Sequence, residues 1–136
     1  MAVGAKLRRL VWQRAGSRCE YCRLPSDCDV FSFTIDHVVA RKHHGETTSD
    51  NLALACAVCN SFKLDNLSGI DPLTVTIAAL FHPRRNHWDE HFAWNAAELV
   101  GLTPEGRATI DVLKINLPER VEHRELLVRM GKFPKS

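Results

Sequence analysis

The stretch that decides the fold runs from residue 19 to residue 60: it opens with C-E-Y-C at 19–22 and closes with C-A-V-C-N at 56–60. Each C-x-x-C pair brings two thiolates close enough to share one metal ion. Two such pairs complete a tetrahedral four-sulfur site with no open position, which is typical of structural zinc. We therefore predict a zinc site, which would hold the residues between the pairs as a loop on a rigid base. Its ligands would be Cys19, Cys22, Cys56 and Cys59.

The composition is compatible with a small zinc-supported domain. The chain has 136 residues, of which 45% are hydrophobic, so we expect one domain over 1–136 whose modest core a zinc ion would help to stabilise. The two-residue spacers fit a metal better than disulfides, which favours a reducing, cytoplasmic location. The fifth cysteine, Cys28, lies in a polar stretch and is expected to have no functional role. We find no signal-peptide pattern and no apolar run of the ~20 residues that cross a membrane.

The net charge of +2 permits binding to nucleic acid without requiring it. Any contact with DNA must therefore come from a local basic patch rather than from the field of the whole protein. For each basic side chain a solvated surface position is the alternative interpretation. The candidates for contact with DNA are Arg41, Lys42, Lys63, Arg84 and Arg85.

Apolar periodicity in the first half of the chain predicts short helices and strands. Phe31, Phe33 and Ile35 alternate with polar residues, which predicts a half-buried strand that presents Asp36 on its polar face. In chain order we expect a helix at 5–15, this strand at 31–36, a polar loop at 41–50, a strand at 51–55 and a helix at 57–66.

The second half is expected to form a further layer of the same α+β body, because no Gly/Ser-rich linker separates it. Trp88, Phe92 and Trp94 would share one face of a strand and pack in the core. The sequence T-P-E at 103–105 is a good helix start, with a threonine cap and proline at the first position. We expect a turn at 71–72, strands at 87–94 and 99–100, and helices at 104–115 and 119–130.

The residues within the cysteine frame are those that phosphodiester hydrolysis needs. His37 can take a proton from a water molecule near neutral pH. Asp36 and Asn60 offer oxygen atoms to a divalent cation that would contact the phosphate, and oxygen ligands favour Mg²⁺ or Mn²⁺. Plainer interpretations exist: Asp36 could cap a turn, His37 could be a surface histidine, and Asn60 could be a residue of a helix N-terminus.

The run D-H-V-V-A-R-K-H-H-G-E-T-T-S-D-N-L-A-L-A-C-A-V-C-N-S-F-K, residues 36–63, resembles the HNH endonucleases in their zinc-knuckled branch of the ββα-metal fold. The resemblance covers about residues 19–66 and leaves 67–136 as a C-terminal extension. It implies a DNA endonuclease in which Asp36 and Asn60 bind the catalytic metal and His37 is the general base. It also gives Asn51 a supporting role, in which its side chain bridges backbone groups of the loop and holds His37 in line.

Two functions follow from these patterns. The leading hypothesis is a metal-dependent DNA endonuclease, and the alternative is a non-catalytic, zinc-ribbon-like module that binds nucleic acid. The trio of Asp36, His37 and Asn60 favours the enzyme, because a pure zinc ribbon needs no acid, base and amide around its knuckles. Three histidines of the segment F-H-P-R-R-N-H-W-D-E-H-F-A-W at 81–94 give no compact metal-ligand set at their spacing.

Overall fold

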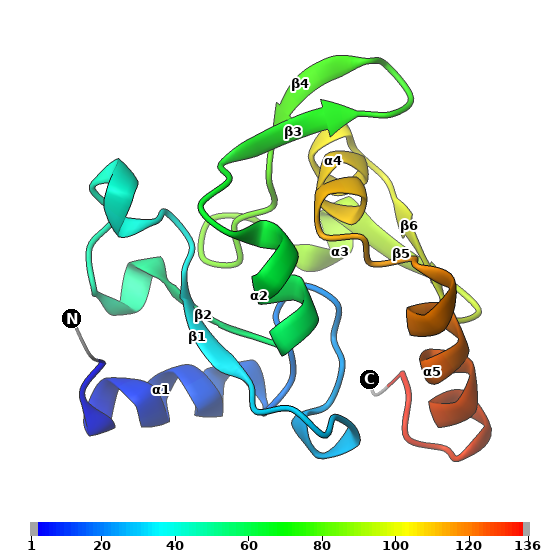
Figure 1. Ribbon diagram of the computed structural model, residues 1–136, viewed down its shortest axis with the longest axis horizontal. Coiled ribbons are helices and arrows are strands. Elements are labelled where there is room, and N and C mark those ends of the chain that lie inside the picture. Colours follow the sequence, from blue (N-terminus) through cyan, green and yellow to red (C-terminus); the bar gives the residue numbers. More distant parts are fainter. Residues whose placement is uncertain (1–2, 135–136) are drawn as a thin grey trace.

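The computed structural model describes residues 3–134 as a mixture of short helices and small two-stranded sheets (Figure 1). The helices are α1 (Ala5–Ala15), α2 (Ala57–Lys63), α3 (Trp88–His91), α4 (Pro104–Val112) and α5 (Pro118–Arg129). The strands are β1 (Thr34–His37), β2 (Leu52–Ala55), β3 (Ser68–Asp71), β4 (Thr76–Ala79), β5 (Phe92–Asn95) and β6 (Glu98–Gly101). The expected mixture of helix and strand is confirmed.

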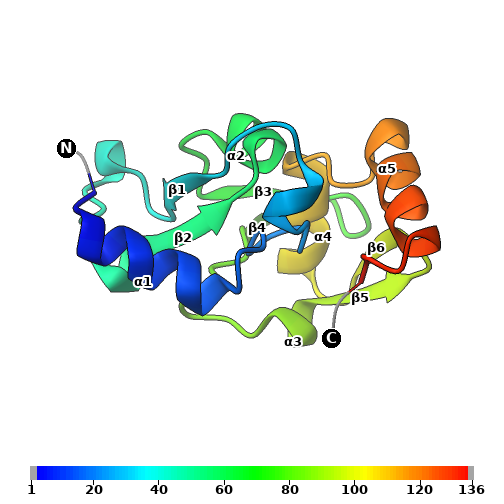
Figure 2. The same ribbon diagram turned by 90° about the horizontal axis from the view of Figure 1, so that it is seen from below.

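The first half is built on the antiparallel pair of β1 and β2, in which Asp36 lies opposite Ala53 and His37 lies opposite Leu52. Helix α1 runs alongside this pair (Figure 2), and the Arg14 guanidinium donates a 2.6 Å hydrogen bond to the Leu52 carbonyl oxygen. Helix α2 follows β2 after a single residue. This order places the Asp-His dipeptide of β1 next to the helix that carries the second cysteine pair.

The predicted elements of the first half exist, but the first strand is shorter than expected. It begins at Thr34 rather than Phe31, because the Asp29 carboxylate accepts the Phe31 backbone N–H in a local turn and leaves the Phe31 ring 64% exposed. The second strand is buried on both faces rather than one. The helix at 5–15 is confirmed at both ends, where Gly16 adopts the left-handed conformation that ends it.

The second half contains a hairpin that the sequence did not predict. Strands β3 and β4 pair antiparallel around the turn that begins at Asp71; the face with Ile70 and Ile77 is exposed, and the other face, with Gly69, Asp71 and Ala78, packs against α4. The buried face carries no large apolar residue, so the hairpin has no apolar alternation that periodicity could detect. The expected strand at 87–94 is wrong in its first part: Trp88–His91 form one turn of helix, and the strand begins at Phe92.

The aromatic residues of the second half pack as expected. Phe92 is buried, and its ring centroid lies 5.2 Å from that of Trp88, which lies 5.9 Å from that of Trp94. Helix α4 begins at the predicted position, where the Thr103 hydroxyl accepts the Gly106 backbone N–H at 3.0 Å. Within residues 3–134, none of the helices has the length and apolar composition needed to span a bilayer.

A buried ion pair ties the β3–β4 hairpin to α4, and Figure 1 shows the two side by side. Both carboxylate oxygens of Asp71 accept hydrogen bonds from Arg107, at 2.9 Å each. Asp71 also accepts the Leu73 backbone N–H and the Thr74 hydroxyl. The pKa of the Asp71 carboxyl lies well below its usual range, mainly because of the hydrogen bonds from the Arg107 guanidinium. The Leu73 and Thr74 donors lower it further.

We predict that Arg107→Met lowers the stability of the protein at neutral pH, because it leaves a buried carboxylate without its cation. Since Asp71 is more acidic in the folded state, its contribution is present above pH ~4 and is lost as pH falls and the unfolded chain takes up the proton first. Urea unfolding should therefore show a difference in the free energy of unfolding between wild type and Arg107→Met that is smaller in acid than at neutral pH. Arg129→Met, at an exposed position, is the matched control. An equal difference at neutral and at acid pH would contradict the assignment of this contribution to Asp71.

Candidate metal centre and catalytic residues

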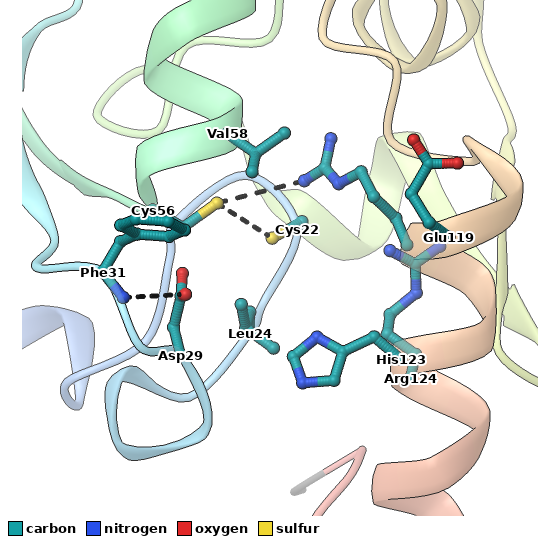
Figure 3. Close-up of a pocket in the computed structure, with 10 residues that line it drawn as sticks. Cys22, Leu24, Asp29, Phe31, Cys56, Val58, Glu119, His123 and Arg124 are labelled. Atoms are coloured by element: carbon teal, nitrogen blue, oxygen red, sulfur yellow. Dashed lines mark hydrogen bonds between the residues drawn. The ribbon is translucent and has the colours of Figure 1, made fainter.

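The four paired cysteines meet at one point. All four side chains are buried, and their sulfur atoms lie within 4.8 Å of one another, with the Sγ atoms of Cys22 and Cys56 3.7 Å apart (Figure 3). Zn–S bonds of about 2.3 Å in a tetrahedron place neighbouring sulfur atoms about 3.8 Å apart, so the spacing and the donor chemistry fit zinc. The cluster joins the segment before β1 to the start of α2.

Each C-x-x-C segment, the first knuckle at 19–22 and the second at 56–59, is preorganised by its own backbone. The Cys22 N–H points at the Cys19 sulfur at 3.5 Å, and the Cys59 N–H points at the Cys56 sulfur at 3.4 Å. These donors would stabilise a metal-bound thiolate at the first cysteine of each pair. Among the thiols, burial raises the pKa of Cys19 and of Cys59, whereas hydrogen bonds from the neighbouring cysteine side chains, Cys19 first, hold the pKa of Cys22 well below its usual range.

An arginine from the C-terminal helix completes the surroundings of the sulfur atoms. Arg120 of α5 lies with Nη2 3.1 Å from the Cys59 sulfur and 3.9 Å from the Cys56 sulfur, while its Nη1 donates to the carbonyl oxygens of Leu113 and Lys114. Burial acts to lower the pKa of Arg120, but the attraction of the cysteines outweighs it and raises the pKa. The guanidinium therefore offsets part of the negative charge that four thiolates would bring.

Asp36 is buried between two donors. The Tyr21 hydroxyl donates to its Oδ2 at 2.7 Å, and the Lys63 ammonium lies 3.1 Å from the same oxygen. Burial is the main cause of the raised pKa of Asp36, and Lys63 and Tyr21 oppose it. The expectation that Asp36 would lie on a polar face is therefore wrong, because a phenol and an ammonium group replace water around this carboxylate.

Lys63 holds the end of β1 against α2. Its side chain is buried, and its Nζ donates to the Val38 carbonyl at 2.9 Å and lies near the His37 carbonyl at 3.5 Å, besides its contact with Asp36. All three donors of the ammonium group thus have protein acceptors within reach. The expectation that Lys63 contacts DNA is wrong, since the buried Asp36 carboxylate and the strand carbonyls take the place of a phosphate.

His37 follows Asp36 on the strand and so points to the other side of it. The ring is half-buried, and its Nε2 lies 2.9 Å from the Thr47 hydroxyl oxygen. Burial lowers the pKa of His37 despite the neighbouring Asp36 carboxylate, so the ring is neutral at neutral pH. A neutral imidazole with one nitrogen engaged by a hydroxyl group has a second nitrogen for chemistry.

Asn51 organises the loop that carries Thr47. Its Oδ1 accepts the Val39 backbone N–H, and its Nδ2 donates to the carbonyl oxygens of Val39 and Glu46, all at 2.9 Å. The loop passes so close to Val39 that a Cβ at Gly45 would lie 1.7 Å from the Val39 carbonyl oxygen, so glycine is required there. The side chain of Asn51 thus bridges the strand that ends at His37 and the loop beside it.

Asn60 lies in α2, half-buried, one turn before Lys63. Residues three apart share a helix face, so Asn60 lies on the side of α2 that faces β1 through Lys63. Lys63 joins Asp36 to α2 along the boundary between β1 and this helix, and Asn60 lies one turn before Lys63.

The other basic residues that we expected to contact DNA differ in their exposure and in their ion pairs. Arg84 forms an ion pair with Glu20, whose second carboxylate oxygen accepts the Leu54 backbone N–H at 2.8 Å, so this arginine links 81–87 to the first knuckle. Lys42 is exposed and lies 3.0 Å from an Asp65 oxygen. Arg41 and Arg85 are exposed.

Three residues near these sites were not identified by sequence reasoning: Tyr21, Thr47 and Arg120. Tyr21 lies inside the first knuckle, where a tyrosine between two metal ligands has a hydroxyl group that burial obliges to find a partner. Thr47 lies ten residues after His37 in a loop of polar residues, any of which could have been the contact. Arg120 lies 61 residues after Cys59, and no spacing rule connects them.

Comparison with known proteins agrees with the resemblance seen in the sequence. No curated protein and no solved structure matches this chain. The sequence model of one family does match, and it covers the residues from the first knuckle to the end of α2. Residues 19–65 match the HNH endonuclease family, and the resemblance carried by the two cysteine pairs and the Asp-His dipeptide is thereby confirmed.

Proposed function

We propose that this protein is a metal-dependent HNH endonuclease that hydrolyses phosphodiester bonds of DNA. Residues 19–66 would be its ββα-metal core, and 67–136 an extension within the same domain. The observation that carries the proposal is the position of Asp36 and His37 at the end of β1, locked against α2 by Lys63 inside a four-cysteine frame. The family match over 19–65 supports the same reaction class.

Asp36 and Asn60 are the residues that would hold the catalytic divalent ion, Mg²⁺ or Mn²⁺. The donor set fits a hard cation, because a carboxylate and an amide offer oxygen atoms. Oδ1 of Asp36 has acceptor capacity left, since its contact with Lys63 is the longer one at 3.4 Å. When bound, such an ion supplies positive charge to the phosphate and to the leaving oxygen. Zinc on the cysteines would be structural.

His37 would act as the general base toward the attacking water. If Nε2–H donates to the Thr47 hydroxyl, Nδ1 keeps its lone pair and can accept the proton of the water. Asn51 would fix the orientation of the ring indirectly, because it pins the backbone that carries Thr47 to the backbone that follows His37. Arg41, Lys42 and Arg85 are the surface cations that would meet the DNA backbone.

One observation favours the alternative, a non-catalytic nucleic-acid-binding module. The Asp36 carboxylate is already engaged by Tyr21 and Lys63, which is what a purely structural aspartate would also show. The two functions differ in what they require of a divalent ion. Binding by a zinc-ribbon-like module would not need added Mg²⁺, whereas hydrolysis would.

We predict that the purified protein contains about one zinc per chain and converts supercoiled plasmid to nicked or linear forms when Mg²⁺ or Mn²⁺ is added. A brief treatment with EDTA should stop cleavage, and Mg²⁺ added without zinc should restore it, because the buried thiolate site exchanges slowly. Elemental analysis before and after the chelation checks that zinc stays. Cleavage that persists in EDTA, or a protein that binds DNA and never cuts it, would refute the metal-dependent nuclease.

Substitution of Asn60 separates the two metal sites more cleanly than substitution of Asp36. Removal of Asp36 would leave the buried Lys63 ammonium without its anion, which destabilises a protein by about 3–5 kcal/mol. Asn60 is half-buried and makes no such pair. Asn60→Ala should therefore lose cleavage in Mg²⁺ and keep its zinc, whereas Asn66→Ala, an exposed residue just beyond the same helix, should keep both.

We predict that His37→Ala cleaves roughly 10²- to 10⁴-fold more slowly than wild type, the usual contribution of a positioned general base. Its zinc content and thermal unfolding midpoint should match those of wild type, since the ring is only half-buried. His43→Ala, at an exposed position in the following loop, is the matched control. Wild-type cleavage by His37→Ala would exclude this residue as the base and direct attention to His43 and His44.

A milder loss is expected for Thr47→Val, which keeps the size of the side chain and removes the hydroxyl that holds the His37 ring. We expect kcat to fall roughly tenfold, the value of one hydrogen bond of about 1.4 kcal/mol, with KM little changed. Thr48→Val, its exposed neighbour, controls for a general effect on the loop. A change in KM alone would instead mean that Thr47 contacts the substrate.

A further inference from the structure

The positive charge of this chain is concentrated at its start. Residues 1–19 contain five of the 18 Lys and Arg residues and none of the 16 Asp and Glu residues, so their formal charge is +5. Because the whole chain carries +2, residues 20–136 together carry −3. Four of the five cations lie in helix α1, which precedes the residues that match the HNH family. A local basic patch of this kind is what a chain of small net charge has available for a polyanion.

Three of these cations lie in solvent without an acidic partner. Lys6, Arg8 and Arg9, here called the α1 cations, are exposed, and none of them lies within ion-pair distance of a carboxylate among residues 3–134. Residues three or four apart share a helix face, so Lys6, Arg9 and the exposed Gln13 point to the same side. The outer face of α1 is therefore a positively charged and polar surface.

The local structure of α1 does not account for these charges. The backbone dipoles of a helix place partial positive charge at its N-terminal end, where acidic side chains are favourable and basic ones are not. The first turn of α1 contains no acidic residue, and no side chain caps its N-terminus. Lys6 and Arg9 also repel each other at their spacing. Residues that oppose the local structure are expected at functional sites, and an anionic partner would neutralise the α1 cations.

Helix α1 is fixed to the strand pair that carries the candidate catalytic residues. Its Trp12 ring packs against Phe33 just before β1, with the ring centroids 6.2 Å apart. Its Arg14 donates a hydrogen bond to the carbonyl oxygen of Leu52, which lies opposite His37 in the β1–β2 pair. Figures 1 and 2 both show the N-terminal half of α1 at the same end of the molecule as the loop between β1 and β2. The α1 cations and His37 thus belong to one rigid unit.

Nucleic acid fits this surface better than a membrane does. A basic amphipathic helix binds lipid by inserting its apolar face into the bilayer. The apolar face of α1 is not available for insertion, because Val11 and Ala15 are buried and Leu7 packs against the core of the protein. Its outer face presents the α1 cations and Gln13, with Leu10 also exposed. Contacts of Lys and Arg with a phosphate backbone need no apolar surface.

We propose that α1 binds the phosphate backbone of a DNA duplex through Lys6, Arg8 and Arg9 and thereby holds the substrate on the unit that carries His37. This inference rests on the proposed nuclease function and adds a substrate-binding helix to it. Because phosphates are the same in every sequence, α1 would contribute affinity without sequence preference. Each contact releases counterions from the DNA, so this contribution weakens as the salt concentration rises.

The test is binding of a labelled DNA duplex to the full-length protein in EDTA, measured by fluorescence anisotropy from about 50 to about 200 mM NaCl. The double variant Lys6→Gln with Arg9→Gln should lose two phosphate contacts, which lowers the slope of log K against log salt by about 1.8 in magnitude. The ratio of its Kd to that of wild type should therefore be roughly tenfold larger at the low salt concentration than at the high one. Arg129→Gln with Lys132→Gln removes two exposed cations at the end of α5 and should keep the wild-type slope.

Two further measurements separate DNA binding from a structural role. The double variant Lys6→Arg with Arg9→Lys keeps both charges and should keep the wild-type slope. The thermal unfolding midpoint of Lys6→Gln with Arg9→Gln should equal or exceed that of wild type, because the helix dipole and like-charge repulsion oppose these cations. A lower midpoint would mean that the cations support the fold and would overturn the inference.

Equal slopes for wild type and the variant without the α1 cations, or equal losses in this variant and in the α5 variant, would also overturn the inference. A loss of binding to phosphatidylserine vesicles with unchanged DNA binding would overturn it and assign α1 to a membrane surface. Plasmid cleavage in Mg²⁺ is measured separately. If wild type shows the expected slope and never cuts, the nuclease proposal fails and the role of α1 stands; if it cuts and the slopes are equal, only the role of α1 fails.

Discussion

Four sulfur atoms within 4.8 Å of one another constrain this molecule more than any other contact. They fix the first knuckle to the start of α2, so that β1 and β2 must lie between two anchored points. Arg120 brings α5 to the same centre and at the same time holds the carbonyl oxygens of Leu113 and Lys114. Because Arg120 belongs to the extension, residues 67–136 contribute a positive charge beside the four thiols. The second half of the chain is thus attached to the cluster that organises the first.

The contact of Lys63 with Asp36 is a second constraint, because it fixes the end of β1, where His37 lies, against α2. A buried ammonium and a buried carboxylate stabilise each other only with good geometry and further hydrogen bonds, which Val38 and Tyr21 supply here. The arrangement fixes the backbone on both sides of His37, so that its ring can be oriented by one hydroxyl group, that of Thr47. The cost of a buried pair is acceptable where the position of the neighbouring residue matters more than stability.

Sequence reasoning succeeded where chemistry depends on short spacing and failed where it depends on tertiary contacts. The sulfur cluster follows from two C-x-x-C pairs, and α1 and α4 follow from periodicity and capping residues. The burial of Asp36 and Lys63 could not be predicted, because each is polar and becomes acceptable in the interior only through the other. The β3–β4 hairpin was missed because its buried face carries glycine, aspartate and alanine, while its large apolar residues, Ile70 and Ile77, are exposed.

The extension is also attached to the first C-x-x-C segment by an ion pair. Arg84 holds the turn at 82–86 to the first knuckle through Glu20, which also accepts the Leu54 N–H of β2. The turn is thereby fixed to the same frame as β1 and β2, so the extension and the first half of the chain form one connected structure around the cysteine cluster.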